Sequence, residues 1–234
     1  MKDLFGKAIL DFQTNNESED LITETSISEA DVMSVAYLFR SFAEMPELEQ
    51  KALELAKGKT LDVGCGAGSH ALYLQNELQL DVTSIDISPN AIEACQLRGL
   101  KNTRVQNLLD IENETFDTII LLMNGTGIFG TLSETTKYLQ KLKSLLNPNG
   151  QILIDSSDII YMFDQDVDGA YEVPADGYYG ELTFTVSYKN ETEDTFPWLY
   201  LDYNTLQNAA NANGLQCELI VEGKHFDYLA RLTL

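Results

Sequence analysis

The chain has 234 residues, of which 44% are hydrophobic, enough for one domain with a sizeable core. It carries 15 Lys and Arg against 37 Asp and Glu, a formal net charge of −22 at pH 7. Nucleic-acid binding depends mainly on cationic side chains that neutralise phosphates, so this charge argues against DNA and RNA as partners. No run of residues approaches the ~20 apolar positions that cross a bilayer, so we expect no membrane span.

Residues 1–58 are expected to form an N-terminal helical region over a single-domain core. The first residues, M-K-D-L-F-G-K-A-I-L-D, lack the uninterrupted apolar segment of a signal peptide. The three cysteines, Cys65, Cys95 and Cys217, are odd in number and widely spaced, which favours a reducing compartment over a disulfide framework. We therefore expect a cytoplasmic protein.

Within this region, the stretch before Ser28 is rich in Thr, Asn, Glu and Ser and is expected to be a mobile connection or lid. The segment S-E-A-D at residues 28–31 has the pattern of a helix start, and apolar positions continue to Phe42, so a helix is predicted there. A second helix is predicted to begin at Met45-Pro46 and to end near Gly58.

The glycine-rich stretch T-L-D-V-G-C-G-A-G, residues 60–68, is the most informative part of the chain. A short strand is predicted just before it, at Lys59–Val63, and a helix just after it, at Ser69–Leu78. This order of strand, glycine turn and helix places a nucleotide-like ligand against bare backbone at a helix N-terminus. Three glycines permit the tight turn and the close approach: Gly64, Gly66 and Gly68.

Two details of the turn indicate which ligand it holds. The third glycine of the dinucleotide pattern G-x-G-x-x-G would fall at Ser69, but Gly68 comes one residue earlier. Asp62 lies two residues before the first glycine, where its carboxylate would repel a pyrophosphate and attract an ammonium group. S-adenosylmethionine fits, because it has no phosphate and carries both an ammonium and a sulfonium. A nicotinamide-dependent oxidoreductase is the disfavoured alternative.

The segment D-V-G-C-G-A-G resembles the first motif of the class I S-adenosylmethionine-dependent methyltransferases, an acidic residue followed by G-x-G-x-G. The resemblance implies a doubly wound, Rossmann-like α/β sheet of seven strands, mostly parallel with an antiparallel last strand. It also implies S-adenosylmethionine as cofactor and S-adenosylhomocysteine as product.

The expected core continues in order along the chain. A strand is predicted at Asp81–Asp86, and Asp86 lies near the ~20-residue offset at which an acidic residue takes the ribose hydroxyls. Asp110 follows a third strand at Thr103–Gln106, and the resemblance implies that it approaches the adenine amino group. The apolar run Phe116–Met123 predicts a strand buried on both faces, with the ligand at its carboxyl end.

The candidate cofactor site therefore combines the glycine turn with residues that follow the next three strands. Taken alone, a glycine turn or a single aspartate is an ordinary structural or solvated feature, and only the ordered set favours a site. Its members are Asp62, Gly64, Cys65, Gly66, Gly68, Asp86, Ile87, Leu109, Asp110, Met123, Asn124 and Gly125. At Cys65 small size is a sufficient explanation for the cysteine.

After this set, a helix is predicted at Leu139–Leu146 and a fifth strand at Gln151–Asp155. The segment L-L-N-P-N-G-Q-I-L-I is similar to the family's L-x-P-G-G-x-L, with Asn149 in place of the first glycine. Residues 59–157 are thus expected to form the cofactor-binding core. Residues 201–234 are expected to close the sheet with a helix at 203–213 and an antiparallel strand pair.

Residues 158–200 form an aromatic-rich insertion that we expect to roof the acceptor site. Glu181–Lys189 alternates as a strand, and most of its aromatic neighbours are expected to pack, while some line the pocket. Tyr178 and Tyr179 are candidates to project a hydroxyl there. The segment with Asp164, Asp166 and Asp168 matches half of a calcium loop, but Ala175 stands where the bidentate acid belongs, so no metal is assigned.

These expectations predict methyl transfer to a small-molecule acceptor, with a protein methyltransferase as the alternative. The acidic composition suits a neutral or cationic acceptor or a basic protein, and it also simply favours solubility. Arg40 or Tyr37 is hypothesised to reach the cofactor's carboxylate; the alternative is a surface Arg near a helix end. His70 is expected to be a surface or packing residue. The sequence identifies neither a general base nor the oligomeric state.

Overall fold

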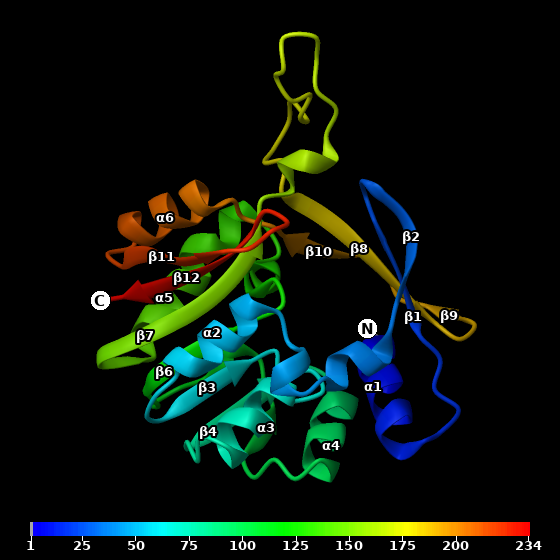
Figure 1. The fold of residues 1–234 in the computed structure, drawn as a ribbon, viewed down its shortest axis with the longest axis vertical. Coiled ribbons are helices and arrows are strands. Elements are labelled where there is room, and N and C mark those ends of the chain that lie inside the picture. The colour runs from blue at the N-terminus through cyan, green and yellow to red at the C-terminus, as the bar shows by residue number, and fades with distance from the viewer. Residues whose placement is uncertain (1) are drawn as a thin grey trace.

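The computed structural model describes residues 2–234, and a seven-stranded sheet forms its centre (Figure 1). The strand order is β11-β12-β7-β6-β3-β4-β5. Neighbours from β7 to β5 pair in parallel, whereas β12 is antiparallel to both β7 and β11. The strands are β3 (Thr60–Val63), β4 (Val82–Asp86), β5 (Thr103–Val105), β6 (Phe116–Leu121), β7 (Leu146–Ser157), β11 (Gln216–Glu222) and β12 (Asp227–Thr233). The predicted fold class is confirmed.

Helices cover both faces of this sheet, which explains the continuous apolar run of β6. Ile119 and Leu121 pack in the cluster that includes α5 (Thr135–Ser144) and α6 (Tyr203–Ala212). Ile120, between them, points into the opposite cluster, because successive side chains of a strand alternate. The helices of that second face are α2 (Glu47–Leu55), α3 (Ser69–Asn76) and α4 (Pro89–Leu97).

The N-terminal region differs from the sequence-based expectation. Instead of a mobile stretch, it contains α1 (Leu4–Thr14) and β1 (Leu21–Thr25). The helix predicted from Ser28 is wrong, because Ser28–Met33 is strand β2, paired antiparallel with β1. The Thr25 hydroxyl explains the difference: it accepts the Ser28 N–H at 3.0 Å and lies 2.7 Å from the Ser28 hydroxyl, so Ser28 closes a hairpin and does not cap a helix.

After β2 the chain makes two short 3-10 turns, Val35–Phe39 and Phe42–Glu44, before α2. The second predicted helix is therefore confirmed, and it begins at Glu47, directly after Pro46. The apolar residues that suggested a longer first helix serve the short turns instead: Leu38, for example, packs with Ala67 and Ala91 beside the glycine turn.

A second sheet joins two parts of the chain that are far apart in sequence. The insertion supplies β8 (Glu181–Tyr188), β9 (Glu191–Thr192) and β10 (Phe196–Leu199). Strand β8 pairs with β1, so the order is β10-β8-β1-β2, with β9 attached to β8. The strand predicted at Glu181–Lys189 is confirmed, and its side chains Leu182, Val186 and Tyr188 are buried, the last two against α1. Figure 1 shows this sheet beside the carboxyl edge of the central one.

Between β7 and β8 the chain forms a projecting loop, at the top of Figure 1. The carboxylate of Asp166 accepts the N–H groups of Asp168 and Ala170 at 2.8 and 2.9 Å, which closes a tight turn. No group of three His, Cys, Asp or Glu residues within 2–234 is placed to hold a metal ion. The segment that matches half of a calcium loop is therefore an acidic turn, closed by hydrogen bonds to the carboxylate of Asp166.

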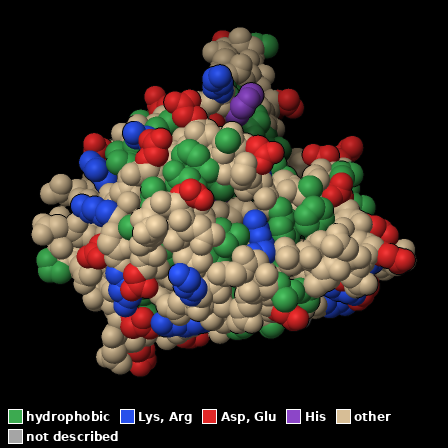
Figure 2. Space-filling view, turned by 60° about the horizontal axis from the view of Figure 1, so that its bottom comes forward, with side chains coloured by type: hydrophobic (Ala, Val, Ile, Leu, Met, Phe, Trp, Pro, Cys, Tyr) green, Lys and Arg blue, Asp and Glu red, His purple; other side chains and the backbone are tan. Residues whose placement is uncertain are grey.

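On the face shown in Figure 2, Lys and Arg side chains are interspersed with Asp and Glu and form no extended basic patch. Among the helices of residues 2–234, none has the length and apolarity that a bilayer crossing requires.

Glu193 attaches the second sheet to α1, and this contact can be tested. Its buried carboxylate accepts the N–H of Leu4 at 2.6 Å and of Lys2 at 3.2 Å, at the start of the helix. We expect Glu193→Ala to lower the free energy of unfolding by about 1–2 kcal/mol, as loss of a helix N-cap does. Glu191→Ala, which removes exposed ion pairs to Lys7 and Lys2, should change it little. Equal effects in urea denaturation would contradict this role.

Candidate functional site

The glycine turn is fixed to the neighbouring strand at the carboxyl edge of the sheet. The N–H groups of Gly64 and Cys65 both donate to the carbonyl oxygen of Ile85, at 2.9 and 3.0 Å. The glycines take left-handed backbone angles, with φ of 71°, 53° and 81° at Gly64, Gly66 and Gly68. A Cβ at Gly68 would stand 2.7 Å from a Leu100 methyl carbon, so the turn needs glycine there.

Asp86, at the end of β4, connects this turn to the next helix. Its Oδ2 accepts the N–H of Gly66 at 2.9 Å, and its Oδ1 accepts the N–H of Ser88 at 2.9 Å. Burial raises the pKa of Asp86, although these backbone hydrogen bonds favour the ionised form. The carboxylate that the sequence assigned to the ribose is thus held by the glycine turn itself.

Asp62 is a buried carboxylate with an unused oxygen. Its side chain is 2% exposed, and Oδ2 has no hydrogen-bond partner among residues 2–234. Burial raises the pKa of Asp62 to about 6, nearby His70 works in the opposite direction, and Asp86 adds repulsion. An unpaired buried oxygen is costly, and a cationic ligand group would satisfy it. The residues present therefore fit the ammonium of S-adenosylmethionine.

The remaining predicted residues come to the same edge after β4, β5 and β6. Ile87 follows Asp86 and is 57% exposed, an unusual position for an isoleucine. Leu109 is half-buried and Asp110 exposed, both in a 3-10 turn after β5. Met123 and Asn124 are half-buried and Gly125 is buried. The structure thus brings the twelve predicted positions to one edge of the sheet.

Asp155 holds the turn after β6, a role that sequence reasoning did not predict. Its two oxygens accept the N–H groups of Met123 at 3.0 Å and Gly125 at 2.8 Å. Met123 and Asn124 have φ of 65° and 61°, a strained conformation for residues with side chains, and the two hydrogen bonds offset that strain. Burial raises the pKa of Asp155 to about 7.

Arg40, Glu49 and His70 form a buried charged network below the glycine turn. Arg40 donates to the Glu49 carboxylate and, at 2.7 Å, to the carbonyl oxygen of Tyr37. His70 Nε2 donates to Glu49 Oε2 at 2.6 Å. Burial works to raise the pKa of Glu49, but its bonds to His70 and Arg40 outweigh this, and the pKa is lowered. The alternative of Arg40 as a surface residue is wrong, since it is 7% exposed.

His70 is therefore a buried polar partner and not a surface residue, and Glu49 was missed altogether. In the sequence, Glu49 is one of several acidic residues in the segment 47–55. Only its position on the apolar side of that helix distinguishes it from the exposed acidic residues. Tyr37 is 44% exposed, and the Arg40 guanidinium lies over its ring at 4.1 Å from the centroid.

The hydroxyls of the two tyrosines proposed for the acceptor side, Tyr178 and Tyr179, are already hydrogen-bonded to carboxylates of the chain. Tyr178 donates to Asp202 Oδ2 at 2.7 Å, and Tyr179 donates to Asp158 Oδ1 at 2.7 Å. Burial, together with these carboxylates, raises the pKa of both phenols, so they stay neutral near pH 7. Tyr178 thus joins the insertion to the start of α6, whereas Tyr179 joins two segments of the insertion.

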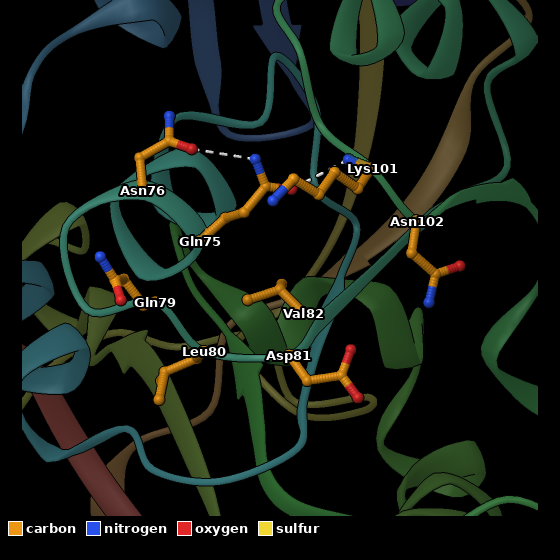
Figure 3. Close-up of a pocket in the computed structure, with 8 residues that line it drawn as sticks. All are labelled: Gln75, Asn76, Gln79, Leu80, Asp81, Val82, Lys101 and Asn102. Atoms are coloured by element: carbon orange, nitrogen blue, oxygen red, sulfur yellow. Dashed lines mark hydrogen bonds between the residues drawn. The ribbon is translucent and has the colours of Figure 1, made fainter.

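Two open surface cavities lie away from this site. One, of about 550 Å³, is lined by Gln75, Asp81, Lys101 and their neighbours at the amino end of β4, the opposite edge of the sheet (Figure 3). The second, of about 520 Å³, lies beside the start of β12 and is lined by Asp158, Asp202 and Glu222 among others. Neither includes a residue of the glycine turn.

Comparison with known proteins agrees with this geometry. The profile of a family described as a methyltransferase domain matches residues 54–198, more than half of the chain. The crystal structure of an S-adenosylmethionine-dependent methyltransferase from Bacteroides fragilis, in complex with S-adenosyl-L-homocysteine, is 47% identical. The alignment covers 100% of this chain and 95% of that one, with a TM-score of 0.91.

More distant relatives share the fold or part of the sequence. A sugar N-methyltransferase from Streptoalloteichus is 14% identical, with a TM-score of 0.56 over 83% of this chain and 87% of its own, which shows a common fold. A ubiquinone biosynthesis O-methyltransferase from Xanthomonas euvesicatoria is 30% identical over 112 residues, 44% of this chain and 45% of the relative. A tRNA U34 carboxymethyltransferase from Pseudoalteromonas translucida is 28% identical over 44% of this chain and 34% of its own length. The chain thus matches less than half of these curated relatives.

The charged network under the turn yields a stability prediction. Glu49→Ala leaves the buried Arg40 without its counter-ion, and we expect a loss of about 3–5 kcal/mol in the free energy of unfolding. Glu54→Ala on the same helix removes an exposed acid that contacts only Lys51 and should have little effect. The comparison is made by chemical denaturation at pH 7; a Glu49→Ala protein as stable as the Glu54→Ala protein would refute the network.

Proposed function

The chain belongs to the class I S-adenosylmethionine-dependent methyltransferases, and we propose that it transfers the methyl group to a small-molecule acceptor by in-line displacement. The single observation that carries the acceptor class is the second sheet, which sets an aromatic surface beside the carboxyl edge where the cofactor residues converge. Such a surface suits a small ligand, because small-molecule sites are concave and mostly apolar with a few polar groups.

We propose that the predicted set of residues binds the cofactor. Asp62 would take the ammonium, because it is the buried acid with a free oxygen. Asp86 would take the ribose hydroxyls and Asp110 the adenine amino group, as the family resemblance implies. The backbone of Gly64, Cys65, Gly66 and Gly68 permits the close approach that the ligand needs. When bound, S-adenosylmethionine supplies the electrophilic methyl on its sulfonium.

Apolar side chains around these acids supply contact area for the adenosyl group. Ile87 is 57% exposed, which is costly for an isoleucine in water and is relieved when a ring covers it. Leu109 and Met123 follow neighbouring strands of the same edge and are half-buried. Asn124 and Gly125 complete the set in the turn that Asp155 holds.

The aromatic surface is formed by side chains of β8 and β10 and by Tyr200, which follows β10. The rings of Phe184 and Trp198 lie 5.9 Å apart, and those of Phe184 and Tyr200 lie 6.4 Å apart. Trp198 packs directly on Gly127, where an added Cβ would stand 2.0 Å from its ring. Because Gly127 belongs to the turn after β6, this contact ties the aromatic surface to the cofactor edge.

Tyr200 is the polar member of this surface. It is half-buried, its hydroxyl makes no hydrogen bond to another residue within 2–234, and burial raises its pKa to about 12. It is therefore a neutral donor at pH 7 and available to a ligand. A phenol of this pKa is not a general base, and we assign none.

The relatives differ in what they act on. The names of two relatives refer to ubiquinone biosynthesis and to sugars, whereas a third refers to tRNA. The net charge of −22 disfavours tRNA for this chain, since phosphates would meet an acidic surface. A basic protein remains the alternative acceptor, and the test below separates it from a small molecule.

In-line transfer requires chiefly that acceptor atom, methyl carbon and sulfur stand in line within a dry site. Positioning of this kind can supply about 7–11 kcal/mol of the barrier. The strained turn at Met123-Asn124, held by Asp155, and the ring of Trp198 on Gly127 are the rigid parts that would provide it.

The acceptor class is tested by following the methyl group. The protein is incubated with methyl-labelled S-adenosylmethionine and a cell extract, which is then separated by size. We expect transfer of label to molecules below about 1 kDa, inhibited by S-adenosylhomocysteine. Label found in protein or in nucleic acid instead would overturn the small-molecule proposal and leave the cofactor assignment intact.

The role of Asp62 predicts a pH-dependent affinity. An ammonium prefers the ionised carboxylate, so the affinity for S-adenosylhomocysteine should fall as pH drops through the pKa of about 6, towards tenfold per pH unit below it. We expect Asp62→Asn to bind weakly and to lose this dependence. Asp81→Asn, at the opposite edge of the sheet, should retain it. Calorimetry between pH 5 and pH 8 measures the effect; an unchanged profile in Asp62→Asn would refute the assignment.

The role of Tyr200 predicts a separation of acceptor from cofactor effects. Removing one hydrogen bond to a ligand costs about 1–2 kcal/mol, so Tyr200→Phe should lower kcat/KM for the acceptor by roughly 5- to 30-fold. The affinity for S-adenosylhomocysteine should stay within about twofold of the wild-type value. Weaker binding of S-adenosylhomocysteine with an unchanged KM for the acceptor would contradict this role, because Tyr200 would then contact the cofactor and not the acceptor.

A further inference from the structure

We propose that Cys65 and Cys95 are an oxidisable thiol pair, and that their disulfide prevents cofactor binding. Their sulfur atoms lie 3.8 Å apart, although the residues are 30 positions apart in sequence. Both are free thiols, 7% and 0% exposed. The methyl-transfer reaction proposed above uses neither sulfur.

The thiol pair links the glycine turn to α4. Cys65 is a residue of that turn, between Gly64 and Gly66. Cys95 is on α4, and its thiol donates to the carbonyl oxygen of Gly66 at 3.2 Å. A Cβ at Gly68 would stand 2.8 Å from the same sulfur. The thiol pair therefore contacts the parts of the turn whose position the cofactor requires.

We expect closure of the disulfide to move the turn. A sulfur–sulfur bond is about 2.05 Å long, so the two sulfur atoms, now 3.8 Å apart, must approach by about 1.8 Å. Cys95 is fully buried in a packed cluster with Leu74, Ile92 and Leu100, which resists movement of α4. Cys65 packs in the same cluster but is flanked by Gly64 and Gly66, which have no side chains to hold them. We therefore expect the displacement to fall mainly on Cys65 and on Gly66, whose N–H is bonded to Asp86. That hydrogen bond fixes the carboxylate assigned to the ribose.

The chemistry needs a two-electron oxidant, and a hydroperoxide is sufficient. The Cys65 thiolate, the more exposed of the two, attacks the peroxide oxygen and becomes a sulfenic acid, with hydroxide as the leaving group. The Cys95 thiol then attacks the sulfenic sulfur, the S–S bond forms, and water leaves. Two thiols are oxidised and one peroxide is reduced to two waters, counting the proton released by Cys65.

Access to the pair depends on the cofactor. A hydrogen bond with Cys95 and burial raise the pKa of the Cys65 thiol, so a closed turn reacts slowly. A bound ligand covers the turn further. We therefore expect the ligand-free protein to be the form that oxidises, at least fivefold faster than the protein saturated with S-adenosylhomocysteine.

The test uses the full chain, hydrogen peroxide as the probe and Cys217→Ser as the background control. Cys217 lies on β11, and its replacement leaves Cys65 and Cys95 as the only two thiols of the chain. We expect a mass loss of two hydrogens and a peptide containing Cys65 joined to Cys95. The Kd for S-adenosylhomocysteine should rise at least tenfold and return to its reduced value with dithiothreitol. In Cys95→Ala, peroxide should change neither the mass in this way nor the Kd relative to that variant's own reduced form.

Three results would overturn the proposal: no Cys65–Cys95 peptide after peroxide, a disulfide in the wild-type protein that is lost in Cys217→Ser, or a Cys65–Cys95 disulfide that leaves the Kd unchanged. Failure here differs from failure of the proposed function, because the reduced protein would still bind S-adenosylhomocysteine. If even the reduced chain does not bind it, the cofactor assignment fails instead.

Discussion

A carboxylate buried without a partner is the constraint on which the rest of the site depends. Asp62 lies one residue before the end of a fully buried strand, and one of its oxygens has no hydrogen bond within the described chain. Because burial raises its pKa to about 6, the native state binds this proton more tightly than the unfolded chain does. The contribution of Asp62 to stability is therefore largest at low pH and is lost as the pH rises from about 4 through 6. The fold carries that cost at the position where we propose that the ammonium of the cofactor binds.

The second constraint is that the turns at the carboxyl edge of the central sheet must keep a fixed conformation although they lie near the surface. Parallel strands bring their carboxyl ends together, but the turns that follow them are strained or glycine-rich. Each turn is held by a side chain from elsewhere: Asp86 bonds the glycine turn, Asp155 bonds the turn after β6, and Trp198 covers that turn from the second sheet. The pairing of β8 with β1 and β10 thus positions Trp198 against the turn after β6.

The central sheet could be predicted from sequence because each of its strands carries a local signal. Thr60–Val63 precedes a glycine turn, and the run at 116–121 is apolar on both faces, as a central parallel strand requires. The helix predicted from Ser28 was wrong although S-E-A-D has the local pattern of a helix start. The hydrogen bond of Ser28 to Thr25 and the pairing of β2 with β1 override that local preference. The pairing of β1 with β8 and the contact of Glu49 with His70 join distant segments, so no local pattern shows them.

The central claim is that the free oxygen of Asp62 receives the ammonium of an adenosyl sulfonium ligand. A crystal structure of this chain with S-adenosylhomocysteine tests it most directly, by the distance from the ligand nitrogen to Asp62 Oδ2. The account predicts a hydrogen bond of about 2.7–3.2 Å, made directly or through one ordered water. A ligand whose ammonium lies elsewhere, with Asp62 Oδ2 still unpartnered, would contradict it.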